Sequence, residues 1–212
     1  MIIVVDGPPA SGKSTVVKYL RLKRGFSAYR YKRLGLVNIF SIMLLPVNPW
    51  DKKVKYYIHS RVDPIILVSS GYLERLSGLL SGLEVVYKCI RYASLFLLAL
   101  VCRNIVIDEG ISLGWANYFN LVLFKRALKR EHVDFLMRID LASLRVLSKV
   151  HEVYYYFIDR SLEKLESNWR KRGHKTPYDV KFYLLVRYAF KLFMETVRER
   201  SINIRVKYVY AS

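Results

Sequence analysis

The first fifteen residues constrain the fold more than any other stretch of the chain. Residues 2–5 form a short run of β-branched apolar side chains, which is typical of a strand buried on both faces. Residues 7–14 read GPPASGKS and match the pattern G-x-x-x-x-G-K-[ST] at every required position. Apolar residues recur at helical spacing over residues 15–20. A strand, a glycine-rich loop and a helix in this order predict a loop that binds phosphate groups.

The residue types in this loop suit a nucleoside triphosphate. Gly7 and Gly12 lack Cβ atoms, so the backbone can bend around a phosphate and point its N–H groups inward. The positive end of the following helix dipole points at the same place. We expect Lys13 to reach the β- and γ-phosphates and the hydroxyl of Ser14 to ligate Mg²⁺. The residues expected to bind ATP are Gly7, Pro8, Pro9, Ala10, Ser11, Gly12, Lys13, Ser14 and Thr15.

Length and composition indicate one globular domain. The chain has 212 residues, and 53% of them are hydrophobic, which excludes an intrinsically disordered protein. Cys89 and Cys102 are far apart and outside any metal-ligand spacing, which fits a reducing, cytoplasmic setting. The N-terminal apolar run is too short for a signal peptide, and the uncharged residues 92–102 are too few to span a bilayer.

The chain is strongly basic, with 36 Lys and Arg residues against 17 Asp and Glu residues and a net charge of +19. Such a surface attracts anions: nucleotides, nucleic acid or an acidic membrane face. A solubilising surface with few acids, or an enzyme that handles two phosphorylated ligands, has the same composition. The charge therefore leaves a nucleic-acid partner open.

A second motif follows the apolar run at residues 105–107. This run ends in Asp108 and Glu109, as expected for a strand that lies beside the phosphate loop. An aspartate at the tip of that strand can hold the Mg²⁺ shell opposite Ser14. The alternative is an acidic turn after a core strand.

Two further segments are candidates for the acceptor side of the site. Arg30 and Arg33 lie at the end of a predicted second strand, residues 26–31, where basic residues face the ligand crevice of a parallel sheet. They also fit a solvated basic turn. Within residues 38–64, the stretch 50–61 interleaves aromatic and basic residues, which can stack a base and hold a phosphate. The same stretch can equally be the solvent-exposed face of a helix whose tyrosines pack inward. Of the two interpretations we favour an acceptor-side insert.

The rest of the chain alternates helical and strand patterns. Helical periodicity predicts one helix at residues 12–24, a pair between residues 65 and 100 with a break near residues 81–82, and helices at residues 111–131 and 141–150. A buried strand is expected at residues 153–159 and a final strand at residues 202–209. Thr176 followed by Pro177 predicts the start of the last helix, with a buried stripe at Phe182, Leu185, Ala189, Leu192, Phe193 and Val197.

In this order of elements the chain resembles the thymidylate kinase-like branch of the P-loop nucleoside monophosphate kinases. The resemblance rests on the loop at residues 7–14, on a helix that closes at residues 99–100 before the strand at 105–108, and on residues 165–173, LESNWRKRG. The last segment looks like the arginine-bearing lid of that family, here about residues 160–178. The resemblance implies a single domain over residues 1–212, with a three-layer αβα fold, a mostly parallel sheet of about five strands and a mobile lid.

Two departures from the family pattern concern the acceptor. Thymidylate kinases carry an Asp-Arg-aromatic triplet where this chain has Asp108, Glu109 and Gly110. They also carry an Arg-Glu-Pro-Gly-like turn after the second strand, where this chain has residues 32–35, KRLG. The resemblance implies a kinase fold and phosphoryl transfer, and it leaves the acceptor open.

The combined reading is an ATP- and Mg²⁺-dependent phosphotransferase that moves the γ-phosphate to a small acceptor such as a nucleotide or nucleoside. Lys13 and the loop amides stabilise charge, and Ser14 and Asp108 hold the metal. By the resemblance, Arg170 and Arg172 close over the phosphates as arginine fingers.

The general base and the competing functions stay open at this point. A hydroxyl acceptor requires a base, for which Glu109, Asp6 and Asp63 are options, whereas a phosphate acceptor requires none. An RNA or DNA 5′-hydroxyl kinase is one alternative, favoured by the charge and by residues 50–61. A P-loop ATPase or nucleotide-binding switch, in which Glu109 orients a water molecule, is the other.

Overall fold

A computed structural model describes residues 1–30, 70–124, 126–174 and 177–211. Its sheet is parallel throughout, with five strands in the order β2-β3-β1-β4-β5. The strands are β1 (Ile2–Asp6), β2 (Ser27–Arg30), β3 (Ile105–Asp108), β4 (Val153–Asp159) and β5 (Arg205–Tyr210). The predicted sheet of about five parallel strands is confirmed.

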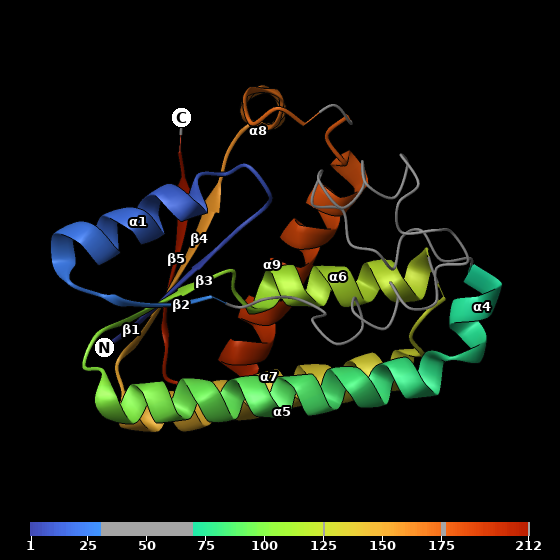
Figure 1. Ribbon diagram of the computed structural model, residues 1–212, viewed down its shortest axis with the longest axis horizontal. Coiled ribbons are helices and arrows are strands. Elements are labelled where there is room, and N and C mark those ends of the chain that lie inside the picture. The colour runs from blue at the N-terminus through green and yellow to red at the C-terminus, as the bar shows by residue number, and fades with distance from the viewer. Residues whose placement is uncertain (31–69, 125, 175–176, 212) are drawn as a thin grey trace, which may run out of the picture.

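Helices cover both faces of this sheet, which gives the predicted three layers (Figure 1). On one face Ile3 and Val5 of β1 pack with Val17 of α1, and on the other face Ile2 and Val4 join the core formed with α5, α6, α7 and α9. Alternate side chains of β1 therefore enter opposite cores, which is why the run at residues 2–5 is apolar throughout. The helices are α1 (Lys13–Arg24), α4 (Ser70–Arg75), α5 (Ser77–Val101), α6 (Ile111–Leu123), α7 (Arg130–Val150), α8 (Leu162–Lys171) and α9 (Val180–Glu199).

The strand register brings the predicted site residues to one edge of the sheet. Val5 of β1 pairs with Asp108 of β3, and Arg30 of β2 pairs with the same aspartate. The carboxyl ends of β1, β2 and β3 therefore meet where the phosphate loop leaves β1. Ligands of open parallel sheets bind at this edge.

The predicted helix break at residues 81–82 is wrong. The chain breaks at Leu76, between α4 and α5, and residues 81–82 lie inside the 25-residue helix α5. The Ser81 hydroxyl bonds back to the Ser77 carbonyl at 2.7 Å and contacts His132 Nδ1 of α7 at 2.6 Å. Packing of α5 against α7 thus stabilises a helix whose own Ser-Gly pair disfavours it.

The predicted helix at residues 111–131 is also wrong at its end. Helix α6 stops at Leu123, and α7 begins at Arg130, so the helix expected at residues 141–150 is the last part of α7. Arg126 lies between the two helices with a left-handed backbone, φ 51°. No glycine or proline marks this turn in the sequence, and the break was therefore not visible in the residue pattern.

The last helix begins later than its sequence signals indicate. Asp179 is the N-cap of α9, and its side chain accepts a hydrogen bond from the Phe182 N–H at 2.9 Å, so the expected start at Thr176 is wrong. The buried stripe is shifted by one residue at several positions. It comprises Tyr183, Val186, Ala189, Phe190, Phe193 and Val197, with Phe182, Leu185 and Leu192 partly buried beside it.

Within the described residues, no helix is both long enough and apolar enough to cross a membrane. The proposed acceptor-side insert at residues 38–64, with its aromatic and basic stretch, lies outside the described residues. Arg33 and Asp63 lie outside them as well.

Candidate active site

The phosphate loop leaves the carboxyl end of β1 and runs into α1 at Lys13. Gly7 has φ 138° and Gly12 has φ 102°, and both values favour glycine. A Cβ atom on Gly7 would lie only 2.1 Å from the carbonyl oxygen of Ile158, because β4 passes directly beside the loop. Gly12 is the N-cap of α1, and because it has no side chain it cannot occupy the first N–H groups of the helix.

Lys13 is the first residue of α1, and its side chain folds back over the phosphate loop. Its side chain is only 7% exposed, and its ammonium group donates to the carbonyl oxygens of Gly7 and Pro8, each at 2.7 Å. Ser14 and Thr15 occupy the first turn of α1 and are exposed. The structure therefore brings together every residue of the predicted phosphate loop.

Asp108 stands next to the loop at the end of β3. Its Oδ1 atom is buried and has no hydrogen-bond partner among the residues that the structure describes. Burial, followed by the charge of Glu109, raises the pKa of Asp108, while Arg30 and Lys13 act in the opposite direction. A buried carboxylate oxygen without a donor is a suitable ligand for a hard cation.

The oxygen donors at this edge fit Mg²⁺. A carboxylate from Asp108 and a hydroxyl from Ser14 are the ligand types that Mg²⁺ takes in phosphoryl-transfer sites, where waters and substrate phosphates complete the shell. No group of three or more His, Cys, Asp or Glu side chains that could hold a metal occurs within the described ranges.

Asp6 ties the phosphate loop to α6. It is fully buried, and its carboxylate accepts the N–H groups of Gly7 at 2.8 Å and Ser112 at 2.9 Å, together with the hydroxyls of Ser112 and Tyr155. A Cβ atom on Gly110 would lie 2.6 Å from Asp6 Oδ2, so only glycine fits there. With its oxygens occupied by these donors, Asp6 is a structural anchor and a poor candidate for the general base.

Glu109 follows Asp108 in the short connection between β3 and α6. It is partly exposed and has a left-handed backbone with φ 70°, which is unfavourable for a residue other than glycine. Backbone strain of this kind is concentrated at functional sites. Of the two options that the structure describes, Asp6 and Glu109, Glu109 is the one with a partly exposed side chain at the loop edge.

The arginines of the predicted lid lie at the end of α8. Arg170 is in its last turn and Arg172 caps it, and both side chains are exposed. In Figure 1, α8 lies beyond the carboxyl end of the sheet, on the same side as the phosphate loop. Their role as arginine fingers stays a prediction.

Three residues near or within the lid contact the loop directly, and the sequence did not identify any of them. Arg160 Nε donates to the Ser11 carbonyl at 2.9 Å, Asn168 Nδ2 to the Ala10 carbonyl at 3.1 Å, and the Tyr178 hydroxyl to the Pro9 carbonyl at 3.1 Å. The acceptors are backbone atoms 149 to 169 residues away in the sequence, so no motif signals these contacts.

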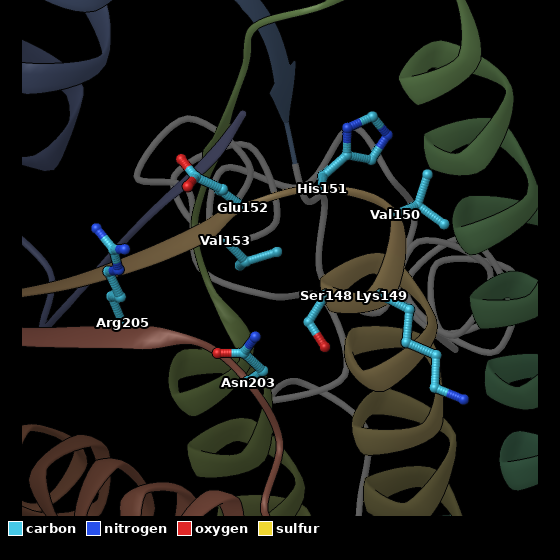
Figure 2. Close-up of a pocket in the computed structure, with 8 residues that line it drawn as sticks. All are labelled: Ser148, Lys149, Val150, His151, Glu152, Val153, Asn203 and Arg205. Atoms are coloured by element: carbon cyan, nitrogen blue, oxygen red, sulfur yellow. The ribbon is translucent and has the colours of Figure 1, made fainter.

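A separate pocket of about 290 Å³ lies at the opposite edge of the sheet (Figure 2). It lies where β4 and β5 begin and is lined by residues 148–153, Asn203 and Arg205. The seven residues of β4 separate it from the phosphate loop by about 20 Å at ~3.3 Å per residue. This pocket is therefore distinct from the candidate site at the phosphate loop.

A parallel sheet in this strand order, with a phosphate loop after its central strand, defines the P-loop kinase fold. Deoxyadenosine kinase from M. mycoides with bound dATP is similar, with a TM-score of 0.53 and 14% identity over 98% of this chain and 90% of that chain. The same enzyme with bound dCTP gives a TM-score of 0.52 and 13% identity over 98% and 89%. At this identity the likeness shows the fold alone.

Thymidylate kinase from Candida albicans also aligns, with 15% identity over 100% of this chain and 84% of that chain. Its TM-score is 0.41, which is too low to carry an argument. No protein-family model and no curated protein matches the sequence. The strand order and the deoxyadenosine kinase match confirm the P-loop kinase fold. The thymidylate kinase-like branch stays a prediction.

Proposed function

We propose that the protein is an ATP- and Mg²⁺-dependent phosphotransferase that moves the γ-phosphate to a nucleoside or nucleotide. The main support is the phosphate loop at the carboxyl edge of the sheet. Two buried polar atoms at this edge, Ser11 Oγ and Asp108 Oδ1, lack hydrogen-bond partners among the described residues. Buried polar atoms are normally paired, so an unpaired hydroxyl and an unpaired carboxylate oxygen beside a phosphate loop fit a site for a phosphate and its cation.

In this proposal the loop amides and Lys13 bind the donor phosphates. The Lys13 ammonium already lies over the loop on the Gly7 and Pro8 carbonyls, from where its flexible side chain can move onto a phosphate oxygen. Arg170 and Arg172 are exposed at the end of α8, from where their long side chains can turn toward charge that develops on the transferred group. We assign these three cations to transition-state stabilisation.

We assign Ser14 and Asp108 to the metal. Bound Mg²⁺ supplies charge neutralisation at the β- and γ-phosphate oxygens. The raised pKa of Asp108 follows from its burial beside Glu109, and a bound cation would act in the opposite direction and favour the ionised form. A cation would therefore stabilise the buried Asp108 carboxylate, whose Oδ1 has no hydrogen-bond donor among the described residues.

On the acceptor side we assign Glu109 as the general base and Arg30 as a cation near the acceptor. Arg30 ends β2 next to Asp108 in the strand register. A nucleoside acceptor presents a hydroxyl, whose proton a partly exposed carboxylate can accept. The deoxyadenosine kinase fold match makes a nucleoside the first acceptor to test.

The wider assignment is a thymidylate kinase-like, cytoplasmic enzyme. Its single domain covers residues 1–212, with the lid at about residues 160–178 and an acceptor-side insert at about residues 38–64. Cys89 and Cys102 are both free thiols in the structure, in keeping with a reducing compartment.

A transfer assay with labelled ATP tests this proposal. Nucleosides, nucleotides and short oligonucleotides are offered in parallel, with Lys13→Ala as the loss variant and Lys18→Ala as the matched control, because Lys18 is an exposed lysine of the same helix. We expect label on a nucleoside or nucleotide, abolished by Lys13→Ala and retained by Lys18→Ala. Label on oligonucleotide ends alone would replace the small acceptor with a nucleic acid, and normal turnover by Lys13→Ala would contradict the site.

A further inference from the structure

Five consecutive carbonyl oxygens of the phosphate loop, at residues 7–11, each accept a hydrogen bond from a side chain. Lys13 is the donor to residues 7 and 8. The other three donors come from the region after β4, and they are Tyr178 to residue 9, Asn168 to residue 10 and Arg160 to residue 11. All carbonyls of this stretch are therefore held toward side chains of the protein.

The direction of these carbonyls fixes the direction of the loop N–H groups. In a trans peptide unit the C=O of one residue and the N–H of the next point in opposite directions, and no peptide bond in the described chain is cis. Tyr178 thus orients the N–H of Ala10, and Arg160 orients that of Gly12. Asn168 orients the N–H of Ser11, which bonds the Pro8 carbonyl at 3.3 Å and closes a turn within the loop.

Ala10 is the residue that most needs this support. Pro8 and Pro9 have no N–H, and the N–H of Gly7 is bound by Asp6, so Ala10 carries the first N–H that the loop can offer to a phosphate. Its backbone is left-handed, with φ 65°, which is unfavourable for a residue with a Cβ atom. The hydrogen bonds from Tyr178 and Asn168 hold the two peptide units on either side of this strained residue.

Apolar packing joins the same parts of the chain. Ala10 belongs to a buried cluster with Leu165, Tyr178 and Tyr183, and Trp169 of α8 packs against it. The rings of Trp169 and Tyr178 meet edge to face with centroids 5.8 Å apart. This cluster therefore holds the Tyr178 ring beside the loop, and Asn168 lies on α8, whose Leu165 and Trp169 join the same packing.

We infer that Tyr178, Asn168 and Arg160 are positioning residues that hold the phosphate loop in its anion-binding shape before a nucleotide arrives. This inference rests on the proposed function only in taking the loop as the site for the donor phosphates. A loop whose N–H groups are already aligned loses less conformational freedom on binding, so these side chains raise affinity without touching the ligand. They act through the peptide units, and Lys13 acts on the phosphates.

Calorimetric titration of the full chain with MgATP, and separately with tripolyphosphate, tests the inference. Tyr178→Phe removes only the hydroxyl and keeps the ring in its cluster, and Asn168→Ala is the second variant. Tyr183→Phe is the matched control, because this tyrosine belongs to the same cluster and its hydroxyl bonds Arg187 rather than the loop. Circular dichroism at the titration temperature checks that each protein is folded, since a fully folded variant shows no loss of affinity from lower global stability alone.

We expect Tyr178→Phe and Asn168→Ala each to raise the Kd for MgATP about three- to tenfold, the effect of one lost hydrogen bond on a binding constant. The Kd for tripolyphosphate should rise by the same factor, and Tyr183→Phe should leave both constants unchanged. The inference would be overturned if both folded variants had the same Kd values as the wild type. It would also be overturned if Tyr183→Phe lost as much affinity as they do. A wild-type protein that binds MgATP but phosphorylates no acceptor would contradict the proposed function and leave the inference in place.

Discussion

Replacing Glu84 with glutamine should remove a pH dependence from the stability of this protein. Glu84 is buried on α5, where its Oε1 accepts the Tyr118 hydroxyl at 2.7 Å and its Oε2 has no hydrogen-bond partner among the described residues. Burial raises the pKa of Glu84 from 4.5 to about 7, against the hydrogen bond from Tyr118 and the charges of Lys88 and Arg91. The nearby Asp140, ion-paired with Lys88, adds slightly to the rise.

The sign and size follow from proton linkage. Because the pKa is higher in the folded state, the folded chain binds a proton between pH 4.5 and about pH 7 that the unfolded chain has released, so stability falls as pH rises through this window. At 1.36 kcal/mol per pKa unit, the full loss for Glu84 is about 3 kcal/mol. Glutamine stays neutral and keeps an oxygen for Tyr118, so this contribution vanishes in Glu84→Gln.

Urea unfolding of the wild type and of Glu84→Gln at pH 5 and pH 8 measures this effect. Taking the difference between the two proteins cancels the other carboxylates, which titrate in both. We expect the variant to gain about 2–3 kcal/mol relative to the wild type between pH 5 and pH 8. Glu131→Gln, at an exposed glutamate of α7, should show no such gain. A constant difference between wild type and Glu84→Gln at the two pH values would refute the reasoning.

Three further predictions concern the site. Arg170→Ala and Arg172→Ala should each lower kcat at least tenfold with a smaller rise in the KM for ATP, and a pure KM effect in steady-state kinetics would demote them to ground-state binding. Gly110→Ala should lower the free energy of unfolding by about 1–3 kcal/mol, because the new Cβ displaces the buried carboxylate of Asp6; unchanged urea unfolding would contradict the contact. Since burial and a neighbouring carboxylate raise the pKa of Asp108, Mg²⁺ affinity in the ATP complex should fall as pH is lowered toward that pKa, more steeply than for free MgATP measured by the same titration.

The strands and the phosphate loop could be predicted because local chemistry determines them. Buried parallel strands require uninterrupted apolar runs, and residues 2–5, 105–107 and 153–158 show such runs. The loop requires glycine at residue 7, where β4 leaves no room for a side chain. Parallel pairing then brings Asp108 beside the loop without further information.

The helix boundaries could not be predicted because tertiary contacts override local propensity. Ser81 and Gly82 suggested a break, but α5 continues through them while Ser81 bonds His132 of α7. The real break between α6 and α7 contains Arg126 in a left-handed conformation that nothing in the sequence announces.

The side chains that hold the loop escaped sequence analysis for a different reason. Arg160, Asn168 and Tyr178 all donate to backbone carbonyls, and a backbone acceptor leaves no trace in the identity of the residue that provides it. The sequence predicts a lid from arginines that could bind phosphate. The contacts observed between this region and the loop are instead hydrogen bonds from side chains to the loop backbone. Only the folded arrangement of β4, α8 and α9 around residues 9–11 makes them visible.

Phosphate release from ATP, measured with and without an acceptor, tests the kinase proposal most directly. In the wild type we expect little free phosphate without an acceptor, and ADP formation matched by phosphorylated product when a nucleoside or nucleotide acceptor is present. Glu109→Gln should lower that transfer, because the base that takes the proton of a hydroxyl acceptor is lost. Robust acceptor-independent phosphate release by the wild type, eliminated by Glu109→Gln, would show an ATPase in which Glu109 orients water and would contradict the kinase assignment.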